Sequence, residues 1–262
     1  MNDRLEPVGV IDSGVGGISV LKKAVEIMPN EDFIYYGDSA NAPYGTKSTE
    51  EIRDLTFAVV EKLRTMGIKA LCVACNTATA AAIKDLRATY TDMPVIGIEP
   101  AVKPAALSTR GGTIIVMATP MTIKQNKFND LLKIYDKDAR IIPLPCPGLM
   151  EMVENWSDDK APLMEYFEET LKPVLQDDTE TIVLGCTHYP FIKRELREYL
   201  GDRDIALIDG SEGTAKQIRR RLGEEGLLRD EDNEGIVTIM NSSEDPKMIE
   251  ISKKLFDMEI DE

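Results

Sequence analysis

The sequence contains KALCVACNTATA at residues 69–80 and TIVLGCTHYP at residues 181–190. In each stretch an apolar run typical of a buried strand leads to a cysteine, Cys75 or Cys186, and then to residues that favour the start of a helix. The two cysteines lie close to half a chain length apart. A thiol at the same kind of strand-to-helix junction in each half suggests two matched acid/base groups that face one substrate.

Short apolar runs alternate with longer helix-compatible segments along the whole chain, which predicts βα units and a largely parallel sheet. Strands are predicted at residues 7–11, 33–37, 69–74, 94–98, 113–118, 140–144, 181–185, 204–208 and 236–240. Helices are predicted at residues 17–28, 48–66, 77–90, 100–109, 120–134, 159–176, 189–200, 211–225 and 245–257.

The predicted strands repeat at a nearly constant offset of roughly 110 residues, which is typical of a duplicated unit. We therefore expect an α/β fold with two pseudo-symmetric domains, each built on a mainly parallel sheet. The segment after about residue 210 has no counterpart at the end of the first repeat, and we expect it to return to the first domain. The predicted domains are residues 1–98 plus 208–262, and residues 99–207.

Composition excludes several classes of protein. The net charge of −15 argues against a nucleic-acid partner, because such binding requires clustered Lys and Arg. No apolar run approaches the roughly 20 residues that a membrane-spanning helix needs, and the first residues, MNDRLEP, do not resemble a secretory signal. A cytoplasmic location is the expectation, and four cysteines without a signal peptide are expected to be reduced thiols.

Ligands of parallel sheets gather at the carboxyl ends of the strands, where the polar candidates of this sequence cluster. They are Asp12 and Ser13, Asp38, Cys75 with Asn76 and Thr77, Thr119, and Cys186 with Thr187 and His188. A helix N-terminus favours thiolate over thiol, and Asn76, Thr77 and Thr187 are good N-cap types. One such cysteine alone would be better explained as a small buried apolar residue, whereas two in matching positions favour function.

Each candidate cysteine has a neighbour suited to proton transfer. His188 is the only histidine of the chain and is expected to assist Cys186, while Asp12 would be its counterpart near Cys75. Cys72 and Cys75 form a C-x-x-C spacing, but side chains three residues apart on a strand point to opposite faces of the sheet. A zinc site needs four ligands, and one histidine without a second C-x-x-C cannot complete it. We therefore expect no metal.

Two loops allow more than one interpretation. The turn at residues 12–17, DSGVGG, resembles part of a dinucleotide fingerprint, but Asp12 would repel a pyrophosphate, so this turn suits an amino acid better. The loop Pro43-Tyr44-Gly45 is equally compatible with a tight turn and with backbone N–H groups presented to an anion.

At these residues the sequence closely resembles the cofactor-independent aspartate/glutamate racemase superfamily, and within it the glutamate racemases. The matching motifs are GVIDSGVGGISVL, YYGDSANAPYGTKS, CNTATA, ATPMTI, the PCP…VE stretch and GCTHYP, which run through most of the chain. The resemblance implies two α/β domains with the active site in the cleft between them. It also implies that the protein interconverts L- and D-glutamate without a cofactor or metal and supplies D-glutamate for peptidoglycan. A homodimer is implied as well.

The resemblance further implies a role for individual residues. Cys75 would deprotonate D-glutamate and Cys186 would deprotonate L-glutamate, with Asp12 and His188 assisting. The residues expected to hold the substrate are Asp12, Ser13, Pro43, Tyr44, Gly45, Asn76, Thr77, Thr119, Glu154 and Thr187. The alternatives are a related racemase acting on aspartate or a hydantoin, a non-catalytic amino-acid-binding protein of the same fold, and, more remotely, a nucleotide-binding oxidoreductase.

Overall fold

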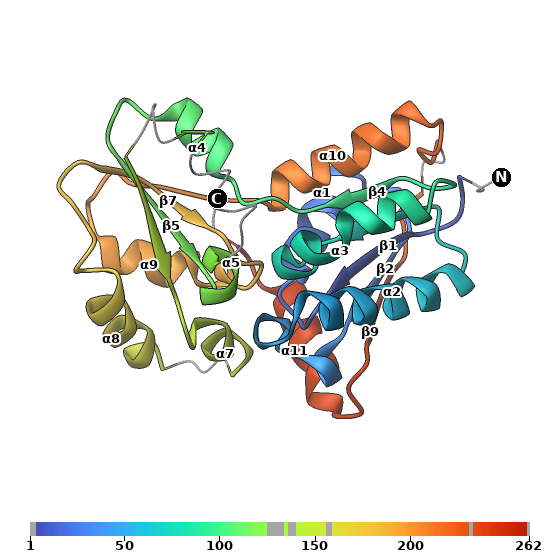
Figure 1. The fold of residues 1–262 in the computed structure, drawn as a ribbon, viewed down its shortest axis with the longest axis horizontal. Helices are drawn as coiled ribbons and strands as arrows, with labels where there is room; N and C mark the ends of the chain where they lie inside the picture. The colour runs from blue at the N-terminus through green and yellow to red at the C-terminus, as the bar shows by residue number, and fades with distance from the viewer. Residues whose placement is uncertain (1–3, 125–133, 136–139, 156–158, 231–232, 261–262) are drawn as a thin grey trace. The chain divides into compact units, whose positions relative to one another are not determined.

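The computed structural model describes residues 4–124, 134–135, 140–155, 159–230 and 233–260. The chain divides into two compact units, each with its own sheet (Figure 1). One comprises Met1–Glu99 and Ser211–Asp257, and the other comprises Pro100–Gly210 and Met258–Glu262. We name them the Cys75 unit and the Cys186 unit after the cysteine that each contains.

The sheet of the Cys75 unit has the strand order β4-β3-β1-β2-β9, and all its pairings are parallel. Its strands are β1 (Val8–Asp12), β2 (Phe33–Gly37), β3 (Ala70–Val73), β4 (Val95–Gly97) and β9 (Val237–Asn241). Every residue of β1, β2 and β3 is buried. Such continuous apolar strands are expected where helices cover both faces of a sheet.

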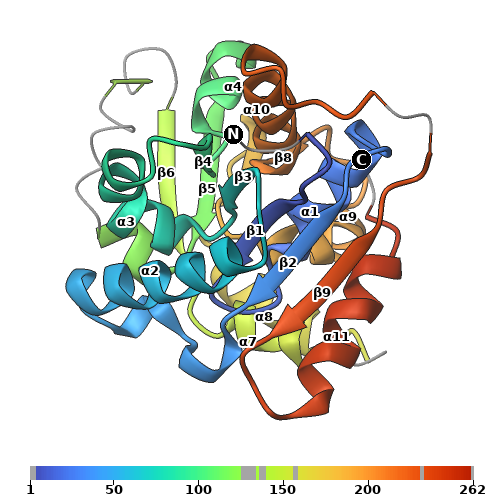
Figure 2. The same ribbon diagram turned by 90° about the vertical axis from the view of Figure 1, so that its right-hand side faces the viewer.

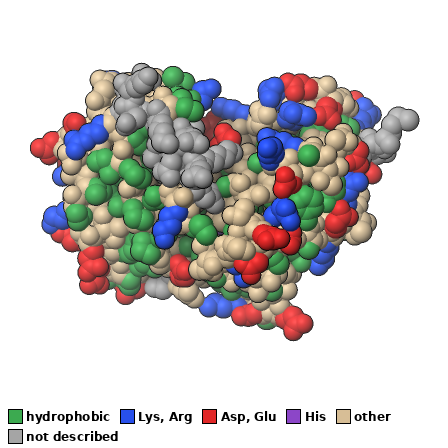
Figure 3. Space-filling view, viewed as in Figure 1, with side chains coloured by type: hydrophobic (Ala, Val, Ile, Leu, Met, Phe, Trp, Pro, Cys, Tyr) green, Lys and Arg blue, Asp and Glu red, His purple; other side chains and the backbone are tan. Residues whose placement is uncertain are grey.

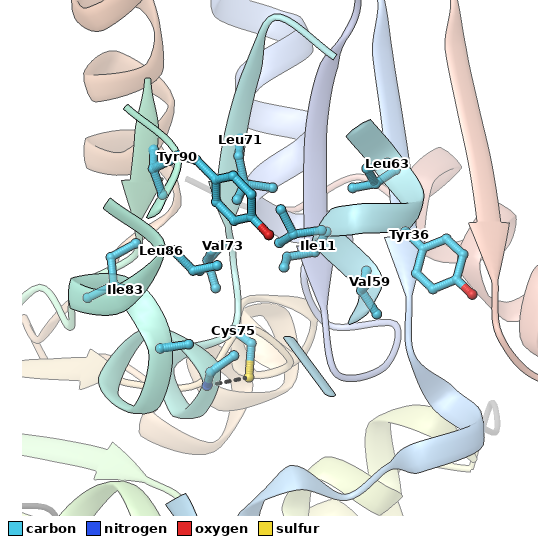
Figure 4. Close-up of a cluster of buried hydrophobic side chains, with 14 of the residues drawn as sticks. Ile11, Tyr36, Val59, Leu63, Leu71, Val73, Cys75, Ile83, Leu86 and Tyr90 are labelled. Carbon is cyan, nitrogen blue, oxygen red and sulfur yellow. Dashed lines mark hydrogen bonds between the residues drawn. The ribbon is translucent and has the colours of Figure 1, made fainter. Parts of the chain in front are cut away.

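Helices cover both faces of this sheet. They are α1 (Ile18–Ile27), α2 (Thr49–Thr65), α3 (Asn76–Thr89), α10 (Ser211–Glu224) and α11 (Pro246–Asp257). Helices α2 and α3 pack together over a cluster that includes Ile11, Leu71 and Val73 (Figure 4). Helix α1 packs against α10 and α11 on the opposite face (Figure 2). The segment after residue 210 thus completes the unit in which the chain began.

The sheet of the Cys186 unit has the strand order β6-β5-β7-β8, again with parallel pairings only. Its strands are β5 (Thr113–Ala118), β6 (Arg140–Pro145), β7 (Thr179–Leu184) and β8 (Ala206–Asp209). Its helices are α4 (Val102–Ser108), α5 (Pro120–Lys124), α7 (Leu149–Glu154), α8 (Ala161–Thr170) and α9 (Lys193–Leu200). Strand β6 carries Pro143 and Pro145, which its place at the sheet edge tolerates.

The two sheets repeat one strand order. Read from the other side, the second sheet runs β8-β7-β5-β6, which corresponds strand by strand to β4-β3-β1-β2 of the first. A duplicated α/β unit requires this correspondence. Strand β3, which leads to Cys75, thereby corresponds to β7, which leads to Cys186, and β9 is an addition to the first sheet beyond the repeat.

The predicted α/β class with mainly parallel sheets is confirmed, and every predicted strand overlaps an observed one. Some helix predictions were wrong in extent. The helix predicted at 159–176 is α8, which is shorter, and the helix predicted at 189–200 begins as a 3-10 turn, η3 (Tyr189–Ile192). Helix α7 and the 3-10 turns η1 (Ser39–Asn41) and η2 (Tyr44–Thr46) were not predicted. Of the helix predicted at 120–134, residues 125–133 lie outside the described residues.

The charge on the one face of the molecule that is drawn as a surface is mixed (Figure 3). On the face drawn in Figure 3, acidic side chains lie among the basic ones. Within the described ranges, no helix has both the length and the apolar character that crossing a bilayer demands.

A buried ion pair fastens the Cys75 unit at the amino ends of its strands. Lys69 is fully buried, and its Nζ donates to a carboxylate oxygen of Glu31 and, at 2.5 Å, to the carbonyl oxygen of Arg4. The other carboxylate oxygen of Glu31 accepts from the backbone N–H of Arg229 at 2.8 Å. The pair therefore joins the start of the chain, the β3 strand and the segment that precedes β9.

Replacing Lys69 tests the contribution of this pair to stability. Lys69→Met leaves the Glu31 carboxylate buried without its cation, and we expect the free energy of unfolding to fall by about 3–5 kcal/mol, measured by urea denaturation. The matched control is Lys216→Met, which breaks an exposed pair with Glu212 one helical turn away and should cost under about 0.5 kcal/mol. Equal losses in the two variants would contradict the assignment.

Candidate active site

Cys75 lies at the point where the chain leaves β3 and enters α3. It is the N-cap of α3, and its Sγ accepts a hydrogen bond from the backbone N–H of Ala78 at 3.4 Å (Figure 4). The Ser13 hydroxyl lies 3.4 Å from the same sulfur. Cys75 is 6% exposed. Because backbone N–H groups and the helix dipole favour negative charge at this position, the surroundings of Cys75 stabilise a thiolate.

The predicted caps of this helix were wrong in detail. Asn76 and Thr77 do not cap α3 but form its first turn, since the sulfur of Cys75 itself takes the place of the capping oxygen. Asn76 presents its Oδ1 to the interior, where the described residues give that atom no hydrogen-bond partner. A buried acceptor without a donor is uncommon in proteins. The Asn76 Oδ1 atom could therefore accept a hydrogen bond from an N–H group of a ligand.

The turn after β1 lies beside Cys75. Asp12 is 4% exposed, and its Oδ1 accepts from the backbone N–H of Gly14 at 2.8 Å. Next in sequence, Ser13 reaches Cys75 as described above. Gly17 is required here because a Cβ at that position would lie 2.7 Å from the Cβ of Asp12. Strands β1 and β3 are neighbours, so the predicted proximity of the Asp12 turn and Cys75 follows from their pairing.

A hydrogen-bonded cluster forms the loop that follows β2. The Tyr44 hydroxyl donates to Asp38 Oδ2 at 2.7 Å, and Asn41 Nδ2 lies 3.1 Å from each carboxylate oxygen of Asp38. Pro43 caps η2, which contains Tyr44 and Gly45. Burial raises the pKa of Tyr44 well above its ordinary value, and the hydrogen bond to Asp38 raises it further. Tyr44 therefore stays a neutral phenol at any physiological pH.

Asp38 was a candidate at the end of a strand but was not among the residues expected to act on or hold the substrate. Asp38 is 3% exposed, and its carboxylate shapes the loop that carries Pro43, Tyr44 and Gly45. The sequence feature that points to this role is the spacing of Asp38, Asn41 and Tyr44. An aspartate precedes two hydrogen-bond donors by three and six residues.

Cys186 lies at the corresponding point of the second sheet. Strand β7 ends at Leu184, and Gly185 donates its N–H to the carbonyl oxygen of Met117 on neighbouring β5 at 2.7 Å. A Cβ at position 185 would lie 2.8 Å from that oxygen, so the close approach requires glycine. Cys186 is 9% exposed, and Thr187 and His188, which follow it, are buried.

The helical segment predicted after Cys186 is present, but its start differs from the prediction. The residues after Cys186 form the 3-10 turn η3, whose N-cap is His188, and α9 begins only at Lys193. Thr187 is therefore not a helix cap. Pro190 lies in the first turn of η3, where its missing N–H is tolerated. The support for the Cys186 sulfur comes from a side chain instead.

Cys186, His188 and Glu154 form a line of hydrogen-bonding groups within the Cys186 unit. The Cys186 sulfur lies 3.7 Å from His188 Nδ1, and His188 Nε2 lies 3.1 Å from Glu154 Oε1. Burial alone would lower the pKa of His188, but its hydrogen bonds and charge interactions with Cys186 and Glu154 outweigh burial and raise the pKa well above the ordinary value. His188 therefore places one ring nitrogen beside the Cys186 sulfur and the other beside the Glu154 carboxylate.

Glu154 reaches this line from the C-terminal end of α7, which begins after Gly148 in a left-handed conformation (φ +81°). Its observed contact is with His188, and its expected role in holding a substrate stays a prediction. Thr119, at the carboxyl end of β5, accepts from the N–H of Thr122 at 3.2 Å and caps the first turn of α5.

The remaining cysteines differ from the two candidates. Cys72 is fully buried within β3, and burial raises its pKa to about 12. Burial likewise raises the pKa of Cys146 to about 12. Both stay thiols at neutral pH. All four cysteines are free, and no group of His, Cys, Asp or Glu among the described residues could hold a metal ion.

The single histidine makes the link between His188 and Glu154 directly measurable. We expect the imidazolium of His188 to persist well above the pH at which a free histidine loses its proton, and Glu154→Gln to lower its pKa because one stabilising anion is removed. The measurement is a pH titration of the only imidazole by ¹H–¹⁵N NMR.

The matched control is Glu151→Gln on the same helix, one turn earlier and exposed. It removes an equal charge from α7 without touching His188 and should leave the titration near that of the wild-type protein. If the two variants titrate alike, the hydrogen bond from His188 to Glu154 does not set the charge of the imidazole.

Comparison with known proteins gives a consistent result. The Asp/Glu/Hydantoin racemase family model matches residues 8–218. A glutamate racemase of Clostridium acetobutylicum is 52% identical to this chain over 258 residues, which cover 98% of this chain and 100% of the relative. The crystal structure of a glutamate racemase of Bacillus anthracis has a TM-score of 0.87 at 33% identity and covers 98% of this chain and 96% of that chain. The glutamate racemase of Francisella tularensis, crystallised with D-glutamate, has a TM-score of 0.83 at 29% identity, with coverage of 98% and 96%.

The residues matched by the family model include both cysteine sites and every strand of the repeated order. The identity to the Clostridium acetobutylicum protein extends over nearly the full length of both chains. The chain therefore belongs to the Asp/Glu/Hydantoin racemase family.

Proposed function

We propose that this chain is a glutamate racemase that interconverts L- and D-glutamate by proton transfer at the α-carbon, with Cys75 and Cys186 as the two bases. The observation that carries the proposal is the matched position of the two thiols. Each follows the corresponding strand of a repeated sheet order, and each sulfur has a hydrogen-bonding group beside it, the N–H of Ala78 for Cys75 and the His188 ring for Cys186. The names of the relatives at about half identity support glutamate as the substrate.

Inversion of a stereocentre by proton transfer requires a base on one face of the α-carbon and an acid on the other. One thiolate takes the α-proton, and the electrons of the broken C–H bond remain on carbon. The opposite thiol then gives its proton to the other face of that carbanion. The first cysteine ends as a thiol and the second as a thiolate, so turnover of the opposite enantiomer or proton exchange with water resets the pair.

The two cysteines would use different means to hold the negative charge. Cys75 relies on the N-terminal N–H groups of α3 and on Ser13, with Asp12 close by, and it would deprotonate D-glutamate. Cys186 relies on His188, whose charge Glu154 supports, and it would deprotonate L-glutamate.

Fixed polar groups would bind the substrate and stabilise charge on its α-carbon. The orphan Oδ1 of Asn76 suits the substrate ammonium, and the neutral Tyr44 keeps its loop free of added negative charge. The other groups expected to hold glutamate are Asp12, Ser13, Pro43, Gly45, Thr77, Thr119, Glu154 and Thr187. The thiols supply the chemistry in this proposal, which calls on no cofactor or metal.

The cellular setting follows from the proposed reaction and from the resemblance. We propose a cytoplasmic enzyme that supplies D-glutamate for peptidoglycan and that acts as a homodimer, as family members often do. The acidic composition suits a small-molecule enzyme rather than a nucleic-acid-binding protein.

Removal of either sulfur tests the two-base reaction. We expect Cys75→Ala and Cys186→Ala each to lower kcat for racemisation at least about a thousandfold, because loss of one acid/base group blocks one half of the proton transfer. The controls Cys72→Ala and Cys146→Ala remove a buried thiol from each unit and should keep kcat within about threefold of the wild-type value. Full activity in Cys75→Ala or Cys186→Ala would exclude the mechanism.

Incubation in heavy water tests the substrate. With L-glutamate and no added cofactor, we expect D-glutamate to form with deuterium at the α-carbon, and L-aspartate under the same conditions to react far more slowly. Faster turnover of aspartate or of a hydantoin would assign the enzyme to another branch of its family. Binding of glutamate without α-proton exchange would indicate a non-catalytic protein.

A further inference from the structure

Strand β9 is the part of the Cys75 unit that the repeated strand order does not explain. It pairs with β2 along its whole length, from Val237 beside Phe33 to Asn241 beside Gly37 (Figure 2). The chain then turns at Ser242 and Ser243 and enters α11. The carboxyl end of β9 consequently lies beside the carboxyl end of β2, where the loop that carries Tyr44 begins.

Three hydrogen bonds connect the end of β9 to that loop. The backbone N–H of Ser242 donates to the carbonyl oxygen of Gly37 at 2.9 Å. Asn241 Nδ2 donates to the Ser39 hydroxyl at 2.8 Å, and the N–H of Ala40 donates to the Ser242 hydroxyl at 2.9 Å. Two of the three therefore come from side chains at the end of β9 and reach η1.

The packing at Gly37 keeps Asn241 in place. A Cβ on Gly37 would lie 2.9 Å from Asn241 Nδ2 on one side and 2.3 Å from the carbonyl oxygen of Gly14 on the other. The end of β2 is therefore enclosed between the turn that carries Ser13 and the end of β9. Only glycine allows both neighbours to approach so closely.

The connection extends from η1 to the loop of Pro43, Tyr44 and Gly45, which we call the substrate loop. Asp38 immediately precedes η1, and its carboxylate accepts from Asn41 at the end of η1 and from Tyr44 in η2. On the other side, the N–H of Asp38 donates to the carbonyl oxygen of Asp12 at 2.9 Å. The segment from 37 to 44 is thus held by β1 on one side and by β9 on the other.

External support matters here because η1 and η2 are single 3-10 turns of three residues each. Such turns have poor internal hydrogen-bond geometry and little stability of their own. The position of Pro43, Tyr44 and Gly45 must then be fixed by bonds from neighbouring elements, since small displacements of a binding group weaken binding and catalysis.

We propose that Asn241 and Ser242 are positioning residues for the substrate loop, so that the C-terminal strand β9 fixes the place of Pro43, Tyr44 and Gly45. This inference rests on the proposed function in one respect, that the loop holds glutamate. Their side-chain bonds to η1 go to Ser39 and Ala40, so the proposed role needs no contact with the substrate. Each acts through η1.

The test compares neighbouring side chains at the end of β9. We expect Asn241→Ala and Ser242→Ala each to raise KM for D-glutamate about fivefold, because each removes one hydrogen bond to η1, with kcat changed less than about twofold. Ser242→Thr keeps the hydroxyl and should restore the wild-type KM. Ser243→Ala is the matched control, because the Ser243 hydroxyl accepts only from the N–H of Asp245 among the described contacts and makes no bond to η1, and its KM should not change.

A second measurement is independent of catalysis. In hydrogen–deuterium exchange followed by mass spectrometry, Asn241→Ala and Ser242→Ala should exchange faster than wild type in peptides covering residues 38–46, and Ser243→Ala should not. If the wild-type protein failed to racemise glutamate, the proposed function would fall, while faster exchange in these two variants would still uphold the positioning role. Wild-type KM together with unchanged exchange in both variants, or an equal rise of KM in Ser243→Ala, would overturn the inference.

Discussion

Parallel strand pairing is the constraint on which the rest of this protein depends. In a parallel sheet the carboxyl ends of all strands lie at the same edge, so residues far apart in the sequence are brought together there by the strand pairing itself. The pairing continues one step past the strands, since Ala74 donates to the carbonyl oxygen of Ile11 and Asp38 donates to that of Asp12. The turns that carry Ser13, Cys75 and Tyr44 are brought together by these backbone bonds.

The repeated strand order places two thiols equivalently but does not give them equivalent surroundings. Cys75 is supported by the backbone of α3, whose N–H groups cannot change their charge. Cys186 is supported by His188, a group that can gain or lose a proton. Duplication therefore accounts for the positions of the sulfurs, whereas their electrostatic environment depends on residues that differ between the halves.

The sequence predicted the strands well because buried parallel strands are continuous apolar runs, such as IVL before Cys186. Helix starts were harder to predict. Thr187 is a residue type that often caps helices, but the chain forms the 3-10 turn η3 there, with His188 as its N-cap and Pro190 in its first turn. The short helix after Gly148 was missed because its sequence has no clear apolar periodicity. The role of Asp38 was missed, because the spacing of Asp38, Asn41 and Tyr44 becomes meaningful only when Tyr44 folds back onto the carboxylate. Tertiary contacts, rather than local preference, determine such features.

The pairing of β9 with β2 has a consequence for biosynthesis. Residues 100–210 leave the ribosome before residues 211–257, yet the latter belong to the unit in which the chain began. Until β9 emerges, the edge of β2 has no partner and exposes backbone N–H and C=O groups to other chains. The first-synthesised unit is therefore among the last to be completed, and the nascent chain must keep that edge unpaired for most of its synthesis.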